Sequence, residues 1–328
     1  MIIPRYWAEA RLRHRERKRQ ITVRRFGWSD VGEAEAQAHA DVRVREALER
    51  VLAGEKLPRR ERRVAYNGAE GMPIREEIVD RAGDTVITRN GYGALCLNTP
   101  NVLFADIDFA VESRPRHVLA SMIFVFALSV GVMIAGLHFS TAASLVVGFF
   151  ASLLLGVPLP GALRRLSAAL RGGHEQVAIR RVRRFLTTHP GWCLRVYRTP
   201  AGLRLLAMHR LFDPREAEVT ACFDALGVDP MYARMCFNQN CFRARISPKP
   251  WRMGLPRIRP PYSAVWRPEH AELPARRQWI ETYEREAKAY AACRFVEMLG
   301  SGASDPEADA VRELHDAFCQ ADQDLKIA

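Results

Sequence analysis

The sequence lacks charge over one long central segment. Residues 118–163 contain no Asp, Glu, Lys or Arg, and His138 is their only ionisable side chain. Internal repeats and low-complexity tracts are also lacking, and cysteine is sparse, with seven residues in 328. Hydrophobic residues make up 48% and charged residues 26%, which excludes collagen, a disordered low-complexity chain and a small disulfide scaffold. The apolar and charged residues are therefore segregated rather than scarce.

The uncharged segment predicts a transmembrane helical hairpin, spanning residues 113–165. A helix over 118–137 would be about 30 Å long, the thickness of a bilayer core. After a short uncharged turn, 141–157 returns, and Pro158 and Pro160 are expected to end this second helix. The alternative is a buried hydrophobic hairpin inside a soluble core.

Arginines flank the uncharged segment on both sides. Arg114 and Arg116 precede it, and Arg164 and Arg165 follow it. Positive residues stay on the cytoplasmic side of a membrane, so both termini are expected there. The first residues lack the apolar stretch of a secretory signal. We therefore expect a multi-pass protein of the bacterial inner (plasma) membrane.

The positive charge is concentrated in two stretches. The chain carries a net charge of +12, residues 1–25 carry +7, and residues 164–184 carry +6. Such a field favours phosphate groups, so the expected partners are a lipid bilayer with anionic headgroups and, alternatively, a nucleotide or nucleic acid. Positive charge beside a membrane hairpin is also expected from topology alone.

Small residues recur every four positions in both apolar helices. They are Ala127, Gly131 and Ala135 in the first, and Ser140, Ser144, Gly148, Ser152 and Gly156 in the second. Such faces allow helix backbones to approach closely in lipid. They predict a tightly packed hairpin or, alternatively, the seam of a homodimer.

The segments on either side of the hairpin are predicted to form one cytoplasmic α+β domain from residues 1–112 and 166–328. It would hold a mixed or antiparallel sheet with flanking helices, interrupted by the hairpin. Alternation and turn residues predict strands at 21–28, 85–88, 94–97, 101–109, 193–197, 203–209 and 241–246. Helices are expected at 30–53, 73–81, 175–188, 214–226, 271–299 and 305–322.

Two carboxylates lie on one apolar strand. Asp106 and Asp108 are two residues apart and point to the same face, because side chains alternate along a strand. Two like charges there are costly unless a cation neutralises them, so the pair predicts a catalytic site that holds Mg²⁺ or Mn²⁺. The alternative is a solvated strand face.

A turn and two arginine-bearing strands offer groups for phosphate. Thr199 and Gly202 lie in a turn before Arg204, where backbone amides and a guanidinium suit phosphate binding. Arg243 and Arg245, interleaved with aromatic residues, suit a nucleotide or single-stranded nucleic acid. The alternatives are an ordinary hairpin turn and a strand that packs Phe242 and Trp251 into the core.

These motifs resemble the archaeo-eukaryotic primase–polymerase core over residues 85–246. Asp106 and Asp108 match that family's first motif, and residues 199–204 match its Gly-bearing turn and following strand. Arg204 stands where the family has a phosphate-contacting His, and a third acid is not apparent. The resemblance implies a metal-dependent nucleotidyltransferase. The whole chain is similar to a bacterial family of two-helix transmembrane proteins without an assigned function.

The cysteines are expected to be reduced and buried, with no zinc site. Cys236 and Cys241 are the close pair, with wider spacing than a zinc knuckle has. A cysteine nucleophile would need a base, for which His174, His189 and His209 are candidates.

Two functions remain open from the sequence. One is a membrane-anchored, metal-dependent enzyme acting on a nucleotide or phosphate substrate, with Asp106 and Asp108 as metal ligands and Arg204 holding phosphate. The alternative is a non-catalytic, membrane-anchored interaction or scaffold module, in which the paired carboxylates are structural.

Overall fold

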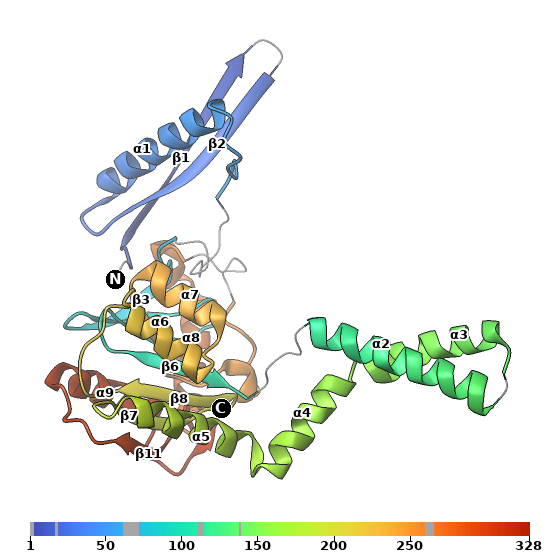
Figure 1. Ribbon diagram of the computed structural model, residues 1–328. Coiled ribbons are helices and arrows are strands. Elements are labelled where there is room, and N and C mark those ends of the chain that lie inside the picture. The colour runs from blue at the N-terminus through green and yellow to red at the C-terminus, as the bar shows by residue number, and fades with distance from the viewer. Residues whose placement is uncertain (1–2, 17–18, 62–71, 110–114, 138, 260–265) are drawn as a thin grey trace. The chain divides into compact units, whose positions relative to one another are not determined.

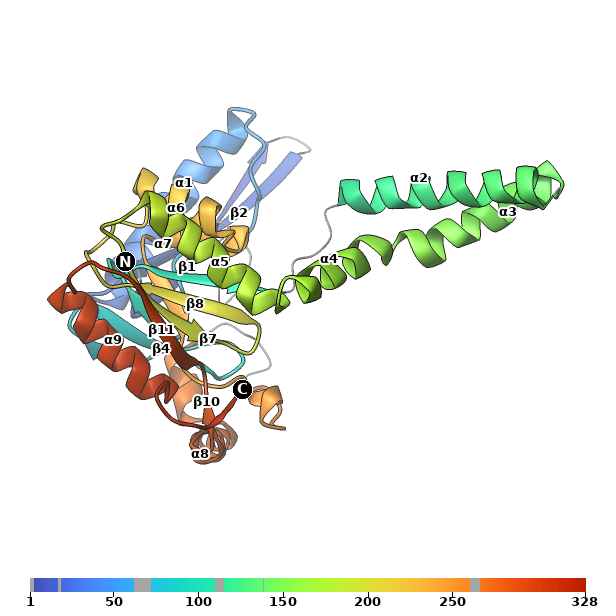
Figure 2. The ribbon, with the colours of Figure 1, turned by 60° about the horizontal axis from the view of Figure 1, so that its bottom comes forward.

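The computed structural model describes residues 3–16, 19–61, 72–109, 115–137, 139–259 and 266–328, so Arg114 and His138 lie outside the described residues. The elements are helices and mainly antiparallel sheets, which confirms the α+β class. The chain divides into two units, whose helices and strands are labelled in Figures 1 and 2. The first comprises Met1–Asp106, His189–Pro200 and Arg204–Ala328, and the second comprises Ile107–Thr188 and Ala201–Leu203.

The first unit begins with a β-hairpin covered by a helix. Strands β1 (Tyr6–Glu16) and β2 (Arg19–Ser29) pair antiparallel, and α1 (Glu33–Leu52) packs against them (Figure 1). A Cβ on Gly27 would lie 2.2 Å from the Ala36 carbonyl oxygen and 2.2 Å from the Ala40 nitrogen. Glycine on the strand and alanine on the helix therefore set how closely α1 approaches β2.

The second part of this unit is a four-stranded antiparallel sheet in the order β3-β4-β5-β9. Its strands are β3 (Glu77–Ala82), β4 (Thr85–Arg89), β5 (Leu95–Thr99) and β9 (Phe242–Arg245). The helix predicted at 73–81 is wrong. Gly83, at φ 56°, turns the chain between β3 and β4, and pairing with the buried β4 outweighs the weak helical pattern.

A second four-stranded sheet has the order β11-β7-β8-β6, and the division between the units falls within β6 and β8. Its strands are β6 (Phe104–Asp108), β7 (Cys193–Arg198), β8 (Gly202–Ala207) and β11 (Arg294–Gly300). The backbone bonds Ala207 N–H to Leu103 O and Phe109 N–H to Ala201 O show that β8 and β6 are antiparallel.

The long helix predicted at 271–299 is also wrong. Helix α8 (Pro274–Ala287) ends early, and β10 (Tyr290–Ala291) and β11 follow it. Strand β11 pairs with β7 over almost its whole length, and this tertiary pairing overrides a local helical pattern.

Three helices and a short strand complete the first unit. They are α6 (Ala217–Leu226), α7 (Pro230–Gln239), α9 (Pro306–Cys319) and β12 (Lys326–Ile327), which pairs parallel with β10. Helix α9 packs on the second sheet, where the ring of His315 lies 5.2 Å from that of Phe104 and 4.7 Å from that of Tyr197.

The second unit is mainly helical. It contains α2 (Pro115–Gly131), α3 (Thr141–Ala151), α4 (Leu159–Leu170) and α5 (Gly173–Thr188), with π-helical turns at Val132–Gly136 and Ser152–Gly156. The runs Pro115–Gly136 and Thr141–Leu170 are long and apolar enough to cross a membrane, and their most apolar 18 residues have mean hydropathies of 2.6 and 2.1. The prolines do not stop the second run: Pro158 precedes α4 and Pro160 occupies its first turn, where proline is tolerated.

The small residues of the second apolar helix face the first. A Cβ on Gly156 would lie 2.7 Å from the Met122 Cα, and one on Gly148 would lie 2.7 Å from a Val130 methyl. The Ser121 hydroxyl donates to the Gly156 carbonyl over 2.6 Å. The small residues of the first helix, including Gly131, are exposed, and the homodimer seam stays a prediction.

The close approach at Gly27 predicts a packing defect in the variant Gly27→Ala. The added methyl cannot fit against the α1 backbone, so we expect a loss of about 1–3 kcal/mol of stability and faster trypsin cleavage within β1 and β2. Gly191→Ala is the control, because a Cβ there meets no atom within 4 Å among the described residues. Equal cleavage rates in the two variants would contradict the packing.

Candidate functional site

Asp106 and Arg204 form a two-pronged ion pair between neighbouring strands. Arg204 Nε donates to Asp106 Oδ1 over 2.8 Å, and Nη2 donates to Oδ2 over 3.0 Å. Nη1 donates to the Arg245 carbonyl over 2.7 Å. The Arg204 side chain is 3% exposed and that of Asp106 is 35% exposed. Although burial lowers it, the Asp106 carboxylate raises the pKa of Arg204 above its usual value, so the guanidinium stays charged.

The ion pair uses one of the two carboxylates of the predicted metal site, which consists of Asp106 and Asp108. Both carboxylate oxygens of Asp106 accept a hydrogen bond from Arg204, and hard cations bind through such oxygens. Asp108 is exposed at the end of β6 and falls in the second unit. The metal-ligand role of the two carboxylates stays a prediction.

In the turn predicted to bind phosphate, Thr199 is buried and Gly202 is sterically constrained. Thr199 is 9% exposed. A Cβ on Gly202 would lie 1.9 Å from the Ile107 carbonyl oxygen. The close approach of two strands therefore accounts for the glycine, and phosphate binding by these residues stays a prediction.

Arg243 lies in a buried ion pair at the β3-β4-β5-β9 sheet. Its Nη2 donates to Glu76 Oε2 over 2.6 Å and Nη1 donates to Asn98 Oδ1 over 3.2 Å. Thr88 also donates to Glu76, over 2.8 Å. Since a buried ion pair is costly to break, Arg243 has a structural role here, and its role in substrate binding stays a prediction.

Arg245 and the two aromatic residues of this segment are placed differently. Arg245 Nη1 donates to the Ser247 carbonyl over 2.6 Å. Phe242 is fully buried, as the core alternative expects, whereas Trp251 is 44% exposed. Stacking of a base on Trp251 stays a prediction.

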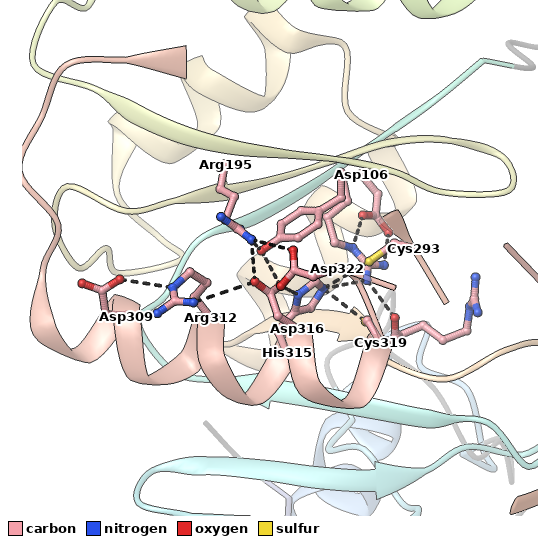
Figure 3. A network of polar contacts seen from close by, with 12 residues as sticks. Asp106, Arg195, Cys293, Asp309, Arg312, His315, Asp316, Cys319 and Asp322 are labelled. Atoms are coloured by element: carbon pink, nitrogen blue, oxygen red, sulfur yellow. Dashed lines mark hydrogen bonds and ion pairs between the residues drawn. The ribbon is translucent and has the colours of Figure 1, made fainter. Parts of the chain in front are cut away.

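A buried polar network lies beside Arg204 and was not expected from the sequence (Figure 3). Arg204 Nη1 lies 3.4 Å from His315 Nε2. His315 Nδ1 lies 2.9 Å from Asp316 Oδ1, which also accepts from the Tyr197 hydroxyl over 2.6 Å. Arg195 Nη2 lies 2.9 Å from Asp316 Oδ2. The network links the Arg204–Asp106 pair to helix α9.

Two cysteine sulfurs also lie near Nε2 of the same imidazole. His315 Nε2 is 3.5 Å from Cys319 Sγ and 3.9 Å from Cys293 Sγ. These three atoms all lie within 4.8 Å of one another, and all three residues are fully buried. Their types are those of zinc ligands. The seven cysteines are buried and free.

Local structure explains how Cys293 reaches the helix. Positions 315 and 319 lie on one face of α9, since residues four apart are neighbours on a helix. The Ala292 N–H donates to the Cys319 carbonyl over 2.9 Å, and the Phe295 N–H donates to the Ala321 carbonyl over 2.9 Å. These bonds bracket Cys293 and hold it against the end of α9.

The thiols and the imidazole influence one another's pKa values. The hydrogen bond from Cys319 lowers the pKa of Cys293 well below its usual value, with His315 acting in the same direction against burial. Burial raises the pKa of Cys319. Although burial lowers it, the Cys293 thiolate and the Asp316 hydrogen bond raise the pKa of His315. Of these two thiols, Cys293 is therefore the more readily deprotonated.

The sequence held one signal for this cluster. His315 and Cys319 have the i, i+4 spacing of a helical ligand pair, whereas the histidines predicted as bases for a cysteine were His174, His189 and His209. Of these, His209 accepts from the Cys193 backbone N–H over 3.3 Å. Cys293 is 22 positions before His315, so only the fold brings it near.

Comparisons of the chain with protein-family models, curated proteins and solved structures find no match. The resemblance to the primase–polymerase core and the similarity to two-helix membrane proteins therefore stay predictions. Any functional conclusion must come from the geometry.

The ion pair predicts that removing Asp106 costs more stability than removing Asp108. Asp106→Ala leaves the Arg204 charge buried without its partner, a change that costs about 3–5 kcal/mol. Because Asp106 is 35% exposed, we expect the low end of that range. Asp108→Ala, at an exposed position, should cost less than about 1 kcal/mol. Urea unfolding of the full chain in detergent measures both.

Variants at the same two positions test the metal hypothesis. If the two carboxylates repel each other as apo metal ligands, removing either one would stabilise the protein without metal. We instead expect Mg²⁺ or Mn²⁺ with a nucleoside triphosphate to shift the melting of wild type and Asp106→Asn/Asp108→Asn equally. A shift seen in the wild type alone would favour the enzyme.

Proposed function

We propose that the chain is a membrane-anchored protein in which the α2–α3 hairpin spans the bilayer and the first unit is a non-catalytic interaction or scaffold module. The observation that carries this proposal is the exposure of large apolar side chains along both helices. Exposed on α2 and α3 are Leu119, Ile123, Phe124, Leu128, Leu145, Val146, Val147, Phe149 and Phe150. Soluble proteins rarely expose so large a contiguous apolar surface.

Little of this apolar surface is buried among the residues that the structure describes. Of the most apolar 18 residues in Pro115–Gly136, 0% are buried. Of the most apolar 18 residues in Thr141–Leu170, 22% are buried. The buried share includes the small residues that face the other helix. This supports a bilayer environment over the alternative of a hydrophobic hairpin inside a soluble core.

Helix α4 supports contact with anionic headgroups. Leu163, Leu166 and Leu170 are 56%, 57% and 80% exposed and share one face, because they are three and seven residues apart. Arg165, two residues after Leu163, is about 200° further around the helix and so falls on a different side from the leucines. A helix with this division lies in the membrane interface, with leucines toward the acyl chains and arginines toward phosphate.

The arginines predicted to bind substrate are already hydrogen-bonded within the protein, which supports an interaction module over an enzyme. Arg204 is bound to Asp106 and to the Arg245 carbonyl, and Arg243 is bound to Glu76. These contacts would have to be exchanged before either guanidinium could hold phosphate. A Mg²⁺- or Mn²⁺-dependent nucleotidyltransferase-like enzyme is the alternative, and the Asp106 and Asp108 variants described above separate the two.

Membrane anchorage predicts the behaviour of charged hairpin variants. An Asp at the centre of a spanning helix costs about 2.5–3.5 kcal/mol, so Leu128→Asp/Phe149→Asp should leave the membrane fraction after alkaline carbonate extraction. The control Val31→Asp/Met231→Asp replaces residues that are 78% and 63% exposed outside the hairpin, and it should stay with the membrane. Release of the wild-type chain by carbonate would refute anchorage.

The arginines that flank the hairpin predict its orientation. With Arg116, Arg164 and Arg165 on the cytoplasmic side, a reporter inserted after Leu137 should be external and one fused after Ala328 should be cytoplasmic. Paired enzymatic reporters that are active on opposite sides of the membrane measure this. An external C-terminal reporter would overturn the orientation while leaving anchorage intact.

A further inference from the structure

We propose that Cys293, His315 and Cys319 bind a zinc ion in the first unit. The three residues come from the segment before β11 and from the last turns of α9 (Figure 3). Zinc is bound by thiolate sulfur and imidazole nitrogen, which are the groups that meet here. The site is independent of the membrane hairpin and of the function proposed above.

The distances fit one tetrahedral ion. Zinc–sulfur bonds of about 2.3 Å and zinc–nitrogen bonds of about 2.0–2.1 Å place a sulfur and a nitrogen about 3.5–3.6 Å apart. His315 Nε2 lies 3.5 Å from Cys319 Sγ and 3.9 Å from Cys293 Sγ. A small movement of the Cys293 side chain would therefore complete the three-ligand geometry.

The outer contacts of His315 prepare it to bind a metal. An ionised carboxylate can only accept, so the 2.9 Å contact between His315 Nδ1 and Asp316 places a proton on Nδ1. When the ring is neutral, the lone pair is therefore on Nε2, the nitrogen that the two sulfurs approach. Asp316 is itself held by the Tyr197 hydroxyl and by Arg195. A carboxylate behind the histidine is the usual support for a zinc ligand.

The charges balance in this buried setting. A Zn²⁺ ion with two thiolates is neutral, and the adjacent Arg204–Asp106 pair is neutral as well. Arg204 Nη1 would lose its 3.4 Å contact with Nε2 but keep its bond to the Arg245 carbonyl. Binding therefore adds no unpaired charge to the interior, which would be costly.

Two other uses of these residues fit less well. A Cys293–Cys319 disulfide would need no histidine, yet His315 Nε2 approaches both sulfurs. A nucleophilic cysteine must reach a substrate, yet Cys293 is fully buried. A metal ion uses all three groups. Water would take the fourth position of the tetrahedron.

The test is metal analysis of the full chain in detergent, stripped with chelator, incubated with Zn²⁺ and freed of excess ion. We expect one equivalent of tightly held zinc in the wild type. Cys293→Ser/Cys319→Ser should lose it, whereas the control Cys222→Ser, which removes another buried thiol, should keep it. Equal zinc content in the wild type and the double variant, or loss of zinc in the control, would overturn the proposal.

A second measurement needs no variant and so does not depend on how the variants fold. Co²⁺ added to the stripped wild-type chain should produce thiolate-to-cobalt charge-transfer bands and the strong visible bands of a tetrahedral ion. Added Zn²⁺ should abolish them. Weak octahedral bands only, or mass-spectrometric detection of a Cys293–Cys319 disulfide in chain purified without oxidant, would refute the site.

Discussion

A guanidinium that is almost fully removed from water constrains the residues around it. Arg204 is 3% exposed, and an uncompensated charge there would be too costly to bury. Asp106 neutralises it from the neighbouring strand, and the Arg245 carbonyl takes a further donor. The ion pair therefore ties β6 to β8 and reaches toward β9, which belongs to the other four-stranded sheet. Asp106 therefore has a structural role, the neutralisation of Arg204, whether or not it also binds a metal.

The same guanidinium is the start of a chain of polar contacts in the interior of the first unit. His315 lies beside it, and behind His315 stand Asp316, Tyr197 and Arg195. Buried polar groups need partners, and here each group supplies one for the next. The unusual feature is that two thiols, besides Arg204, lie near Nε2 of the imidazole. This combination distinguishes the cluster from an ordinary buried ion-pair network and is the reason for proposing a zinc ion there.

The second unit differs from the first in having long uncharged helices with exposed apolar side chains. Its apolar helices keep large side chains on the outside and place Gly148 and Gly156 between them. In water this arrangement would expose the surface that folding normally buries. In a bilayer the same arrangement is favourable, because lipid covers the large side chains and small residues allow close helix packing. The net charge of +12 is accordingly weaker support for nucleic acid than it first suggests, since part of it flanks the hairpin.

Composition and periodicity determined the α+β class, most strands, and the two helices long enough to cross a membrane, because these depend on local alternation and on uncharged length. Local patterns failed at β3 and at β10–β11, where pairing with a distant strand outweighed weak helical propensity. They also could not show that Arg204 is bound to Asp106 98 positions earlier, or that Cys293 lies against His315. Those relations depend on which strands and helices become neighbours, and only the tertiary structure decides that.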